Sequence, residues 1–387
     1  MRWGDDVAIV GLGHTEFSTD SGRSELQLAV EAVTAALREA EIRPADVDGL
    51  ATYSIDYNAE VDVFESIGGR DLKFFSRVDY GGGAACAPLQ QAAMAIKTGV
   101  AEVVVCYRAM NERSNYRFGA GSNPAGGRSS ARSIGWLHTS LGMRTPAAGL
   151  GMAMRRYMHL YGATSEDFGR IAVTARKHAA TNPLARFYGR PITMDDYMAS
   201  RMIADPFRLY DCCQESDGAV AVVVTSAERA RDLPSTPVFV RAAAQGICDH
   251  QGVMWNFYRD DISWASESAL VARQLYEQSG LAPADIDAAI LYDHFGPTVL
   301  QSLEAYGFCG RGEAKDFIKD GAIEVGGRLP VNTNGGQVGE AYIHGMNGVA
   351  EAIRQLRGVA ANQVAGAKNV LVTAGLGVPT SGAILGV

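Results

Sequence analysis

The chain has 387 residues, of which 47% are hydrophobic and 20% charged, a composition typical of a globular protein with a sizeable core. Its formal net charge of -8 and a pI of about 5.5 argue against a nucleic-acid partner. No apolar run approaches the ~18 residues of a membrane span, so no membrane association is expected.

The start of the chain and its cysteines indicate a reducing compartment. The segment MRWGDDVAIVGLG begins as a strand and lacks the layout of a signal peptide. The six cysteines contain no CxxC pair and no paired spacing. We therefore expect a cytoplasmic protein with reduced thiols, no metal site and no bound cofactor.

The first 108 residues alternate between strand and helix signals. An amphipathic helix is predicted at Ser24–Leu37, and a helix follows the glycines Gly81–Gly83. Strands are predicted at Val7–Val10, Gly49–Ser54, Phe74–Val78 and Val103–Tyr107. The GLG after the first strand is not a dinucleotide fingerprint, because Glu16 stands where the third glycine would be. The alternation favours a mixed or parallel sheet covered by helices.

Residues 109–208 differ in character and read as a large insertion between strands. They are rich in Arg, Met, Gly and aromatic residues and have few strand signals. Helices are predicted near Met152–Tyr161, Ser165–Ala180 and Met194–Arg201, before a buried strand at Ala219–Thr225. Insertions of this length often cover an active site.

The second half of the chain repeats features of the first. The segment Pro44–Asp48 matches Pro283–Asp287, which precedes a strand predicted at Ala288–Tyr292. Likewise Gly99–Val105 matches Gly366–Val372. Two matches in the same order predict a duplicated domain. We assign residues 1–108 and 209–232 to an N-terminal half, 109–208 to the inserted loop domain and 233–387 to a C-terminal half.

Each half carries a glycine-rich turn into a helix, at Gly81–Gly83 and at Gly345–Gly348. The second turn belongs to the stretch NTNGGQVGEAYIHGMNG at 332–348. Exposed N–H groups and the helix dipole at such a turn stabilise negative charge, although a plain turn before a core helix has the same pattern. If the halves pack as a pseudo-dimer, the two turns would meet at one site.

Three motifs resemble the thiolase superfamily, and specifically its sterol-carrier-protein-type branch, also called lipid-transfer proteins. They are the opening VAIVGLGHTEF at 7–17, the segment DCCQESDGA at 211–219 and the Asn-x-x-Gly-Gly signature as NTNGG at 332–336. The resemblance covers nearly the whole length. It implies the α/β thiolase fold, with duplicated βαβαβαββ halves in five αβαβα layers, and an acyl-CoA ligand.

The chain departs from the thiolase pattern at each catalytic position. The nucleophilic cysteine position falls at Gly82, or at Gly83 if shifted by one. The family's His-Asp-Cys-Phe stands as YDHF, which puts Tyr292 in place of the first histidine. Its Gly-His-Pro-x-Gly stands as AYIHG, which puts Tyr342 in place of the second, and the C-terminal cysteine position falls near Ala374.

These departures resemble the steroid side-chain aldolases of the lipid-transfer-protein group. Without the cysteine no acyl-enzyme forms, so thiolase chemistry is not expected. The resemblance implies retro-aldol cleavage of 17-hydroxy-3-oxo-pregnene-20-carboxyl-CoA to a 17-ketosteroid and propionyl-CoA. It also implies a homodimer core and a zinc-ribbon/OB-fold partner that belongs to an enoyl-CoA hydratase complex.

A tyrosine has an ordinary pKa of about 10, so a tyrosine base at neutral pH needs a lowered pKa or a proton relay. We hypothesise that Tyr292 and Tyr342 divide the acid and base roles. His294 and His344 either relay protons, donate to the enolate oxygen or point elsewhere. The residues expected to bind the substrate or its enolate are Gly82, Gly83, Gly345, Trp255 and Phe295.

Other interpretations stay open from the residues alone. The chain is either this aldolase, a condensing enzyme that recruits Cys86 as a displaced nucleophile, or a non-catalytic acyl-CoA-binding scaffold. Asp79 and Asp293 flank the expected site but are equally explained by capping. Four arginines either meet CoA phosphates or a partner, or belong to a solvated loop; they are Arg113, Arg117, Arg128 and Arg132.

Overall fold

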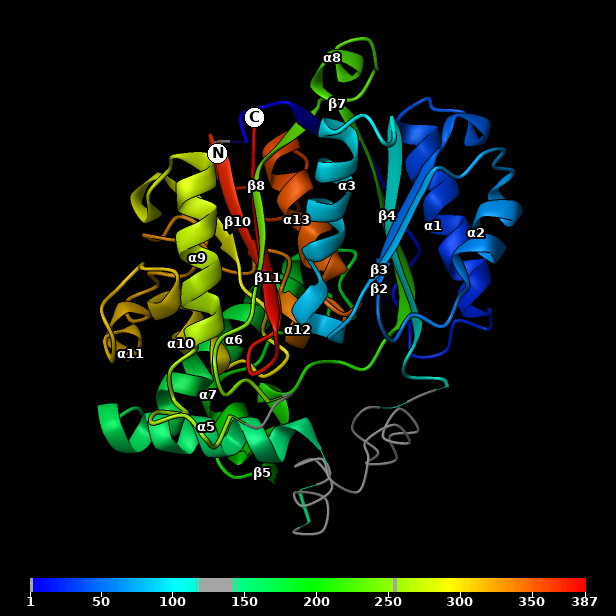
Figure 1. The fold of residues 1–387 in the computed structure, drawn as a ribbon. Coiled ribbons are helices and arrows are strands. Elements are labelled where there is room, and N and C mark those ends of the chain that lie inside the picture. The colour runs from blue at the N-terminus through cyan, green and yellow to red at the C-terminus, as the bar shows by residue number, and fades with distance from the viewer. Residues whose placement is uncertain (1–2, 116, 118–141, 144, 253–255) are drawn as a thin grey trace.

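The computed structural model describes residues 3–115, 117, 142–143, 145–252 and 256–387, which fold around a nine-stranded mixed sheet (Figure 1). From one edge to the other, the strands follow the order β3-β2-β4-β7-β1-β8-β11-β10-β9. Their bounds are β1 Val7–His14, β2 Gly49–Tyr53, β3 Phe74–Val78, β4 Val103–Asn111, β7 Asp217–Ser226, β8 Val238–Gly246, β9 Ala288–Ile290, β10 Asn369–Thr373 and β11 Thr380–Gly386.

The sheet repeats one pairing scheme on either side of its centre. In the first half β2 pairs in parallel with β3 and β4, while β4 and β1 each pair antiparallel with β7. In the second half β9 pairs in parallel with β10 and, through Ala289, with Val331, while β10 and β8 each pair antiparallel with β11. A short antiparallel contact between β1 and β8 joins the halves. The predicted duplication is therefore present in the topology.

Helices complete a five-layered arrangement (Figure 1). One outer layer contains α1 (Glu25–Glu39) and α2 (Glu60–Ile67), and the other contains α9 (Ser266–Ser279) and α10 (Thr298–Ala305). Between the two halves of the sheet lie α3 (Ala87–Lys97) and α13 (Met346–Arg357). Successive side chains of a strand serve different layers, because they point to opposite faces. The predicted thiolase fold is confirmed.

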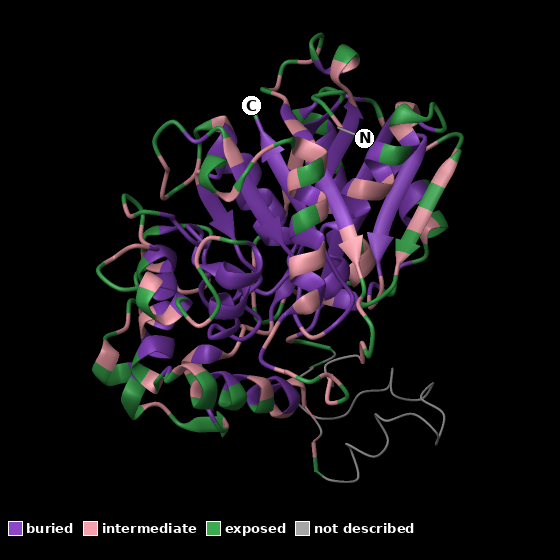
Figure 2. Cartoon of the chain, turned by 60° about the vertical axis from the view of Figure 1, so that its left-hand side comes forward, coloured by how far each residue is buried: buried purple, intermediate pink, exposed green. Residues whose placement is uncertain are grey.

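In the middle layer α13 is buried on all sides, whereas the outer helices α1, α2 and α9 are amphipathic. Every residue of α13 from Met346 to Leu356 is buried, including Glu351 and Arg354. Figure 2 shows this contrast, with buried residues along the central strands and exposed residues on the outer helices. Ser24 caps α1, where its Oγ accepts a hydrogen bond of 3.1 Å from the backbone N–H of Gln27.

The predicted strand at Ala288–Tyr292 is shorter than expected and ends at Ile290. Beyond it, side chains replace the strand ladder as hydrogen-bond partners. The backbone N–H of Leu291 donates to Asn332 Oδ1 at 2.7 Å, and that of Tyr292 donates to Thr373 Oγ1 at 2.9 Å. Tyr292 consequently lies in a loop beyond the end of β9. There the alternation of side chains between the two faces of a strand does not fix the direction of its ring.

The inserted region contributes helices that support the second glycine-rich turn. They are α5 (Pro146–Tyr161), α6 (Ser165–Thr181) and α7 (Met194–Ala199), followed by a ribbon of β5 (Met202–Ala204) and β6 (Phe207–Arg208). α6 packs so closely on α12 (Gly336–Gly339) that a β-carbon added to Gly339 would lie 2.8 Å from the Ala179 Cβ. Two further short α-helices lie in the described residues, α8 (Ala227–Ala230) and α11 (Ala314–Phe317).

Candidate active site

The two glycine-rich turns meet between the halves of the molecule. A β-carbon added to Gly345 would lie 2.7 Å from the Ala85 Cβ, and one added to Gly81 would lie 2.9 Å from His344 Cε1. Ala85 and Gly81 precede α3, while His344 and Gly345 precede α13. The predicted convergence of the turns is confirmed.

The side chains of Tyr292 and Tyr342 face each other at this junction. Their hydroxyl oxygens are 3.0 Å apart, and their rings meet edge-on at 75°. Both residues are buried, at 3% and 6% exposure. The backbone of Tyr342 is held by a parallel bridge to Glu215 and by its N–H, which donates to Ser216 Oγ at 3.2 Å. The segment just before β7 therefore sets the position of Tyr342, and the end of β9 sets that of Tyr292.

Gly82 makes room for the phenol of Tyr292. A β-carbon on Gly82 would lie 1.9 Å from the Tyr292 hydroxyl oxygen and 2.6 Å from Cζ of the same ring. Such distances do not occur between real atoms, so any side chain at Gly82 would displace the phenol. Gly83 is equally constrained, because its added β-carbon would lie 2.0 Å from the carbonyl oxygen of Pro379. The tyrosine hydroxyl thus occupies the space that a side chain at Gly82 would fill.

Burial controls the protonation of the site. It raises the pKa of Tyr292 and Tyr342 well above the ordinary value of 10.0, and the charge of Glu112 adds to this effect on both. Burial likewise lowers the pKa of His294 to about 3 and, with the charge of Arg108, lowers that of His344 well below 6.5. At neutral pH the site consequently presents two neutral phenols and two neutral imidazoles. This environment gives no support to a tyrosine base with a lowered pKa.

The other predicted site residues are placed unequally. His294 and Phe295 line the side of the site next to Tyr292, with ring centroids 5.0 Å apart for Tyr292 and His294. Phe295 stacks on Phe207 at 4.8 Å and 7° and turns its edge to His294. Phe295 therefore contacts both His294 and Phe207 of the inserted region. Trp255 lies outside the described residues.

Cys86 is a core residue. It is 0% exposed, and its Sγ donates to the carbonyl oxygen of Val372 at 3.7 Å. Burial raises the pKa of its thiol to about 12, which disfavours the thiolate that a nucleophile needs. This environment gives no support to a displaced cysteine nucleophile.

The charged residues left open by the sequence are mostly engaged locally. Arg117 and Arg113 both pair with Glu215, at 2.6 and 3.8 Å. Asp79 Oδ1 accepts from the backbone N–H of Tyr80, whereas Asp293 Oδ1 accepts from that of Gln337 at 2.7 Å inside the core. Arg128 and Arg132 lie outside the described residues. Because Glu215 also bridges to Tyr342, the two paired arginines lie close to the backbone segment that holds Tyr342.

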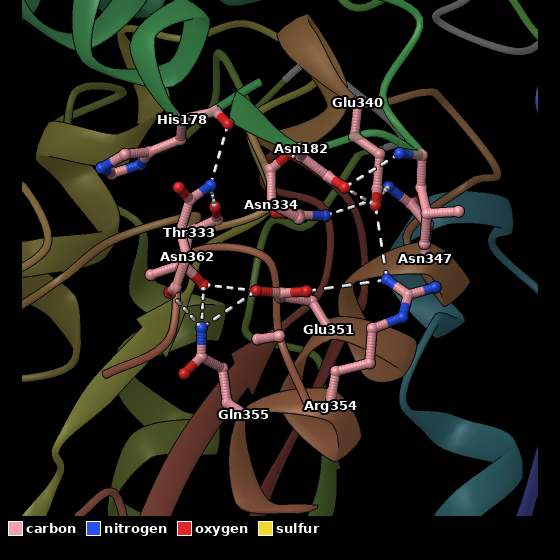
Figure 3. Close-up of polar contacts among 12 residues, drawn as sticks. His178, Asn182, Thr333, Asn334, Glu340, Asn347, Glu351, Arg354, Gln355 and Asn362 are labelled. Atoms are coloured by element: carbon pink, nitrogen blue, oxygen red, sulfur yellow. Dashed lines mark hydrogen bonds and ion pairs between the residues drawn. The ribbon is translucent and has the colours of Figure 1, made fainter. Parts of the chain in front are cut away.

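A buried polar network holds the turn that carries Tyr342 (Figure 3). Glu340, which is 0% exposed, accepts hydrogen bonds from the side-chain amides of Asn334, Asn347 and, at 3.2 Å, Asn182. The Arg354 guanidinium lies 3.4 Å from Glu340 and 3.6 Å from Glu351. Asn182 brings the inserted region into this network, because it also donates to the carbonyl oxygen of Asn334 at 3.0 Å. The network ties the segment Asn332–Gly348 to α13.

Sequence reasoning missed two residues of the site, Tyr53 at the end of β2 and Arg108 within β4. Both are 0% exposed and both contact His344. Arg108 had a detectable signal, since an arginine inside the apolar run VVVCYRAM is costly to bury without a purpose. Tyr53 had none, because a tyrosine is common in strands.

Within the described ranges, no group of three or more His, Cys, Asp or Glu side chains is arranged to hold a metal ion. In the same part of the chain, every helix is too short or too polar to span a bilayer.

Comparison with known proteins agrees with the geometry. Residues 254–386 match the family model for the thiolase C-terminal domain-like family. The chain is 61% identical to the steroid side-chain-cleaving aldolase of Thermomonospora curvata, over 98% of this chain and 97% of that protein. It is 60% identical to the 17-hydroxy-3-oxo-4-pregnene-20-carboxyl-CoA lyase of Mycobacterium tuberculosis, over 98% of this chain and 99% of that protein.

A solved structure named "Ltp2-ChsH2(DUF35) aldolase" superposes with a TM-score of 0.95 at 59% identity and covers 100% of this chain and 99% of that chain. The shared fold, the tyrosines at the two histidine positions and the missing cysteine at Gly82 thus agree with close sequence identity over the full length. The chain belongs to the steroid side-chain-cleaving aldolase family of the thiolase superfamily.

Proposed function

We propose that this protein is a lyase that cleaves 17-hydroxy-3-oxo-pregnene-20-carboxyl-CoA by a retro-aldol reaction, giving a 17-ketosteroid and propionyl-CoA. Identity of about 60% to a lyase named for this substrate supports the choice of steroid. The observation that carries the chemistry is the pair of buried hydroxyls of Tyr292 and Tyr342, 3.0 Å apart beside Gly82. CoA enters as part of the substrate.

The reaction moves one proton without consuming it. A base removes the proton of the substrate's 17-hydroxyl as its C–O bond becomes a carbonyl. The bond between C17 and the carbon next to the thioester then breaks, and its electron pair becomes the thioester enolate. Protonation of that carbon gives propionyl-CoA. The proton lost from oxygen therefore equals the proton gained by carbon.

Two neutral phenols in contact suit this balance. Each tyrosine hydroxyl can accept one proton while it donates its own, so the pair can pass the proton along without leaving a phenolate in the buried site. The raised pKa of both residues favours this concerted relay over a standing tyrosinate base. The donors proposed for the enolate oxygen are the backbone N–H groups of Gly82 and Gly345 and the neutral histidines. The N–H of Gly83 is excluded, because it already donates to the carbonyl oxygen of Tyr80 at 3.1 Å.

The decisive assay incubates the protein with this steroid-CoA thioester and follows propionyl-CoA and the 17-ketosteroid by chromatography. The expected result is that both products appear in equal amounts. An analogue without the 17-hydroxyl is the matched control, because it has no proton for the base to remove. Turnover of that analogue, or an acyl-enzyme trapped on cysteine, would contradict the retro-aldol reaction.

We further propose that the protein works with a zinc-ribbon/OB-fold partner belonging to an enoyl-CoA hydratase complex. The name of the solved structure at 59% identity, which includes a ChsH2(DUF35) component, supports such a partner. The assay is therefore run with and without a ChsH2(DUF35)-type protein, and activity is expected to rise with it. All six cysteines are free thiols, which is compatible with the proposed cytoplasmic location.

A homodimer core is also proposed, formed by pairing of β3 strands. β3 is an edge strand of the sheet, and Phe75 on it is 66% exposed. An open edge with an exposed aromatic residue is suited to pairing with a second strand. Phe75→Lys should convert the dimer to a monomer in light scattering, whereas Phe75→Tyr should not. A monomeric native protein would refute this part.

A further inference from the structure

Arg108, which lies within β4, is the largest fully buried side chain among the described residues. Its Nη1 donates to the carbonyl oxygen of Tyr53 at 3.0 Å and lies 4.0 Å from Asp56 Oδ2. Its Nη2 donates to the carbonyl oxygen of Ile55 at 2.8 Å and contacts His344 Nδ1 at 2.8 Å. The guanidinium therefore connects the end of β2 in the N-terminal half to a site histidine in the C-terminal half.

The contact with Arg108 determines where the His344 ring carries its proton. A guanidinium has only donors and stays charged in proteins, so His344 Nδ1 must accept. The neutral ring then carries its hydrogen on Nε2. Burial first, and then the charge of Arg108, lowers the pKa of His344 well below 6.5, so the doubly protonated ring is disfavoured.

The Nε2 edge of the ring faces the bare backbone of the first turn. A β-carbon added to Gly81 would lie 3.1 Å from His344 Nε2, and one added to Gly82 would lie 3.1 Å from His344 Cδ2. The same point at Gly82 is 1.9 Å from the Tyr292 hydroxyl oxygen. The imidazole N–H and the phenol hydroxyl thus converge on the place that lacks a side chain.

The orientation of His344 is held against its backbone preference. Its φ of +54° is in the left-handed region, which is unfavourable for a residue with a side chain. The Tyr53 hydroxyl donates to the His344 carbonyl oxygen at 3.0 Å, and the Arg108 Cζ stacks 4.8 Å from the centre of the Tyr53 ring. Two buried residues of the N-terminal half therefore hold His344: Tyr53 binds its backbone carbonyl and Arg108 binds its ring.

We propose that Arg108 is a positioning residue that locks His344 in its Nε2–H tautomer and aims this N–H at the substrate's thioester oxygen. The inference deepens the proposed function, on which it rests. As the bond to C17 breaks, negative charge develops on the thioester oxygen. A donor that is already oriented stabilises this charge without reorganising. His344 acts as a neutral donor and takes no part in the proton relay between the tyrosines.

The first test uses NMR to observe the tautomer directly in wild-type protein whose histidine nitrogens are isotopically labelled. Long-range nitrogen–proton spectra distinguish a ring nitrogen that carries hydrogen from one that does not, and His344→Gln identifies the signals of residue 344. Hydrogen on Nε2 is expected. Hydrogen on Nδ1 would overturn the proposal, and this readout stays valid even if the protein does not cleave the proposed substrate.

The second test compares four variants in the cleavage assay. Glutamine places an amide N–H near the position of Nε2, whereas asparagine reaches only the position of Nδ1. Arg108→Met and His344→Asn should each lower kcat about 10²–10³-fold with little change in KM, the range expected for an oriented donor. His344→Gln should keep much more of the activity, and Arg108→Lys should recover part of what Arg108→Met loses.

A double variant separates positioning from a general structural role. If Arg108 acts through the histidine ring, Arg108→Met should have a much smaller effect in the His344→Gln background than in wild type. Equal loss in both backgrounds, or an unchanged kcat in Arg108→Met, would overturn the inference. If Arg108→Met does not fold, the milder Arg108→Lys is taken through the same cycle. Absence of cleavage by wild-type protein would instead refute the proposed function.

Discussion

The turns that precede α3 and α13 occupy equivalent places in the duplicated fold, but their contents are opposite. The turn before α3 is nearly bare, because Gly81, Gly82 and Gly83 stand where side chains would collide with the other half. The turn before α13 carries Tyr342 and His344 into the same space. The comparison shows how one half supplies room and the other half supplies reactive groups.

The supports of the two turns differ in the same way. The bare turn is held by neutral hydroxyls: Ser54 Oγ accepts from the backbone N–H of Gly81 at 3.0 Å, and Ser381 Oγ donates to the Gly83 carbonyl oxygen at 2.7 Å. The reactive turn is held by the buried charges of Glu340, Glu351 and Arg354. Buried charged supports are sensitive to the loss of one partner, which leaves an uncompensated charge, and to pH.

Adding a side chain to the bare turn should have the largest effect. Gly82→Ala is expected to reduce kcat/KM by at least the ~10²–10⁴-fold that loss of an acid–base group causes, because the methyl group would displace the Tyr292 hydroxyl. Cleavage kinetics with the steroid-CoA measure this. Gly296→Ala is the matched control, since its β-carbon would lie 3.8 Å from the nearest neighbouring atom, Ile171 Cγ2. Wild-type activity in Gly82→Ala would break the comparison.

Removing one hydroxyl from the pair tests the reactive side. Tyr292→Phe and Tyr342→Phe should each lower kcat by about 10²–10⁴-fold, and the double variant should lose little more, because the two hydroxyls form one relay. Single-turnover rates give the comparison, and unchanged melting temperatures would show that the fold is intact. Near-wild-type rates in both single variants would exclude the relay.

Weakening the charged support should destabilise the protein more than weakening the neutral one. Arg354→Met leaves Glu340 and Glu351 buried without their cation, which is expected to cost about 3–5 kcal/mol of unfolding free energy. Ser381→Ala removes a hydroxyl from the bare turn and should cost about 1–3 kcal/mol. Denaturant unfolding measures both. The reverse order would show that the hydroxyl support of the bare turn contributes more to the free energy of unfolding than the charged support does.

The charged support should also make the stability of the protein depend on pH, with a smaller effect than the loss of Arg354. Burial raises the pKa of Glu351 from 4.5 to about 6, so between these values the folded chain keeps a proton that the unfolded chain has lost. The folded state therefore loses stability as pH rises through this window, by about 2 kcal/mol. In Glu351→Gln, the free energy of unfolding should therefore fall less between pH 4.5 and pH 6.5 than it does in the wild-type protein. An unchanged slope would mean that Glu351 does not titrate there.

Much of the fold could be predicted from local pattern. The strand at Phe74–Val78 has the bounds expected from the sequence, and the helix predicted at Ser165–Ala180 is α6, one residue longer. Short-range periodicity decides such elements, because each side chain's face follows from its position in the strand or helix. The same reasoning failed at Tyr292, where side-chain acceptors on Asn332 and Thr373 end the strand early.

The two tyrosines, the missing cysteine and the repeated Pro-Ala-Asp segments are properties of the sequence alone, and the comparison with thiolase motifs depends on nothing else. Only the tertiary structure decided that the Tyr292 hydroxyl fills the space above Gly82 and that Arg108 sets the tautomer of His344. The physical reason is separation along the chain. Arg108 and His344 are 236 positions apart, and only packing of the two halves brings a buried charge within 2.8 Å of a ring nitrogen.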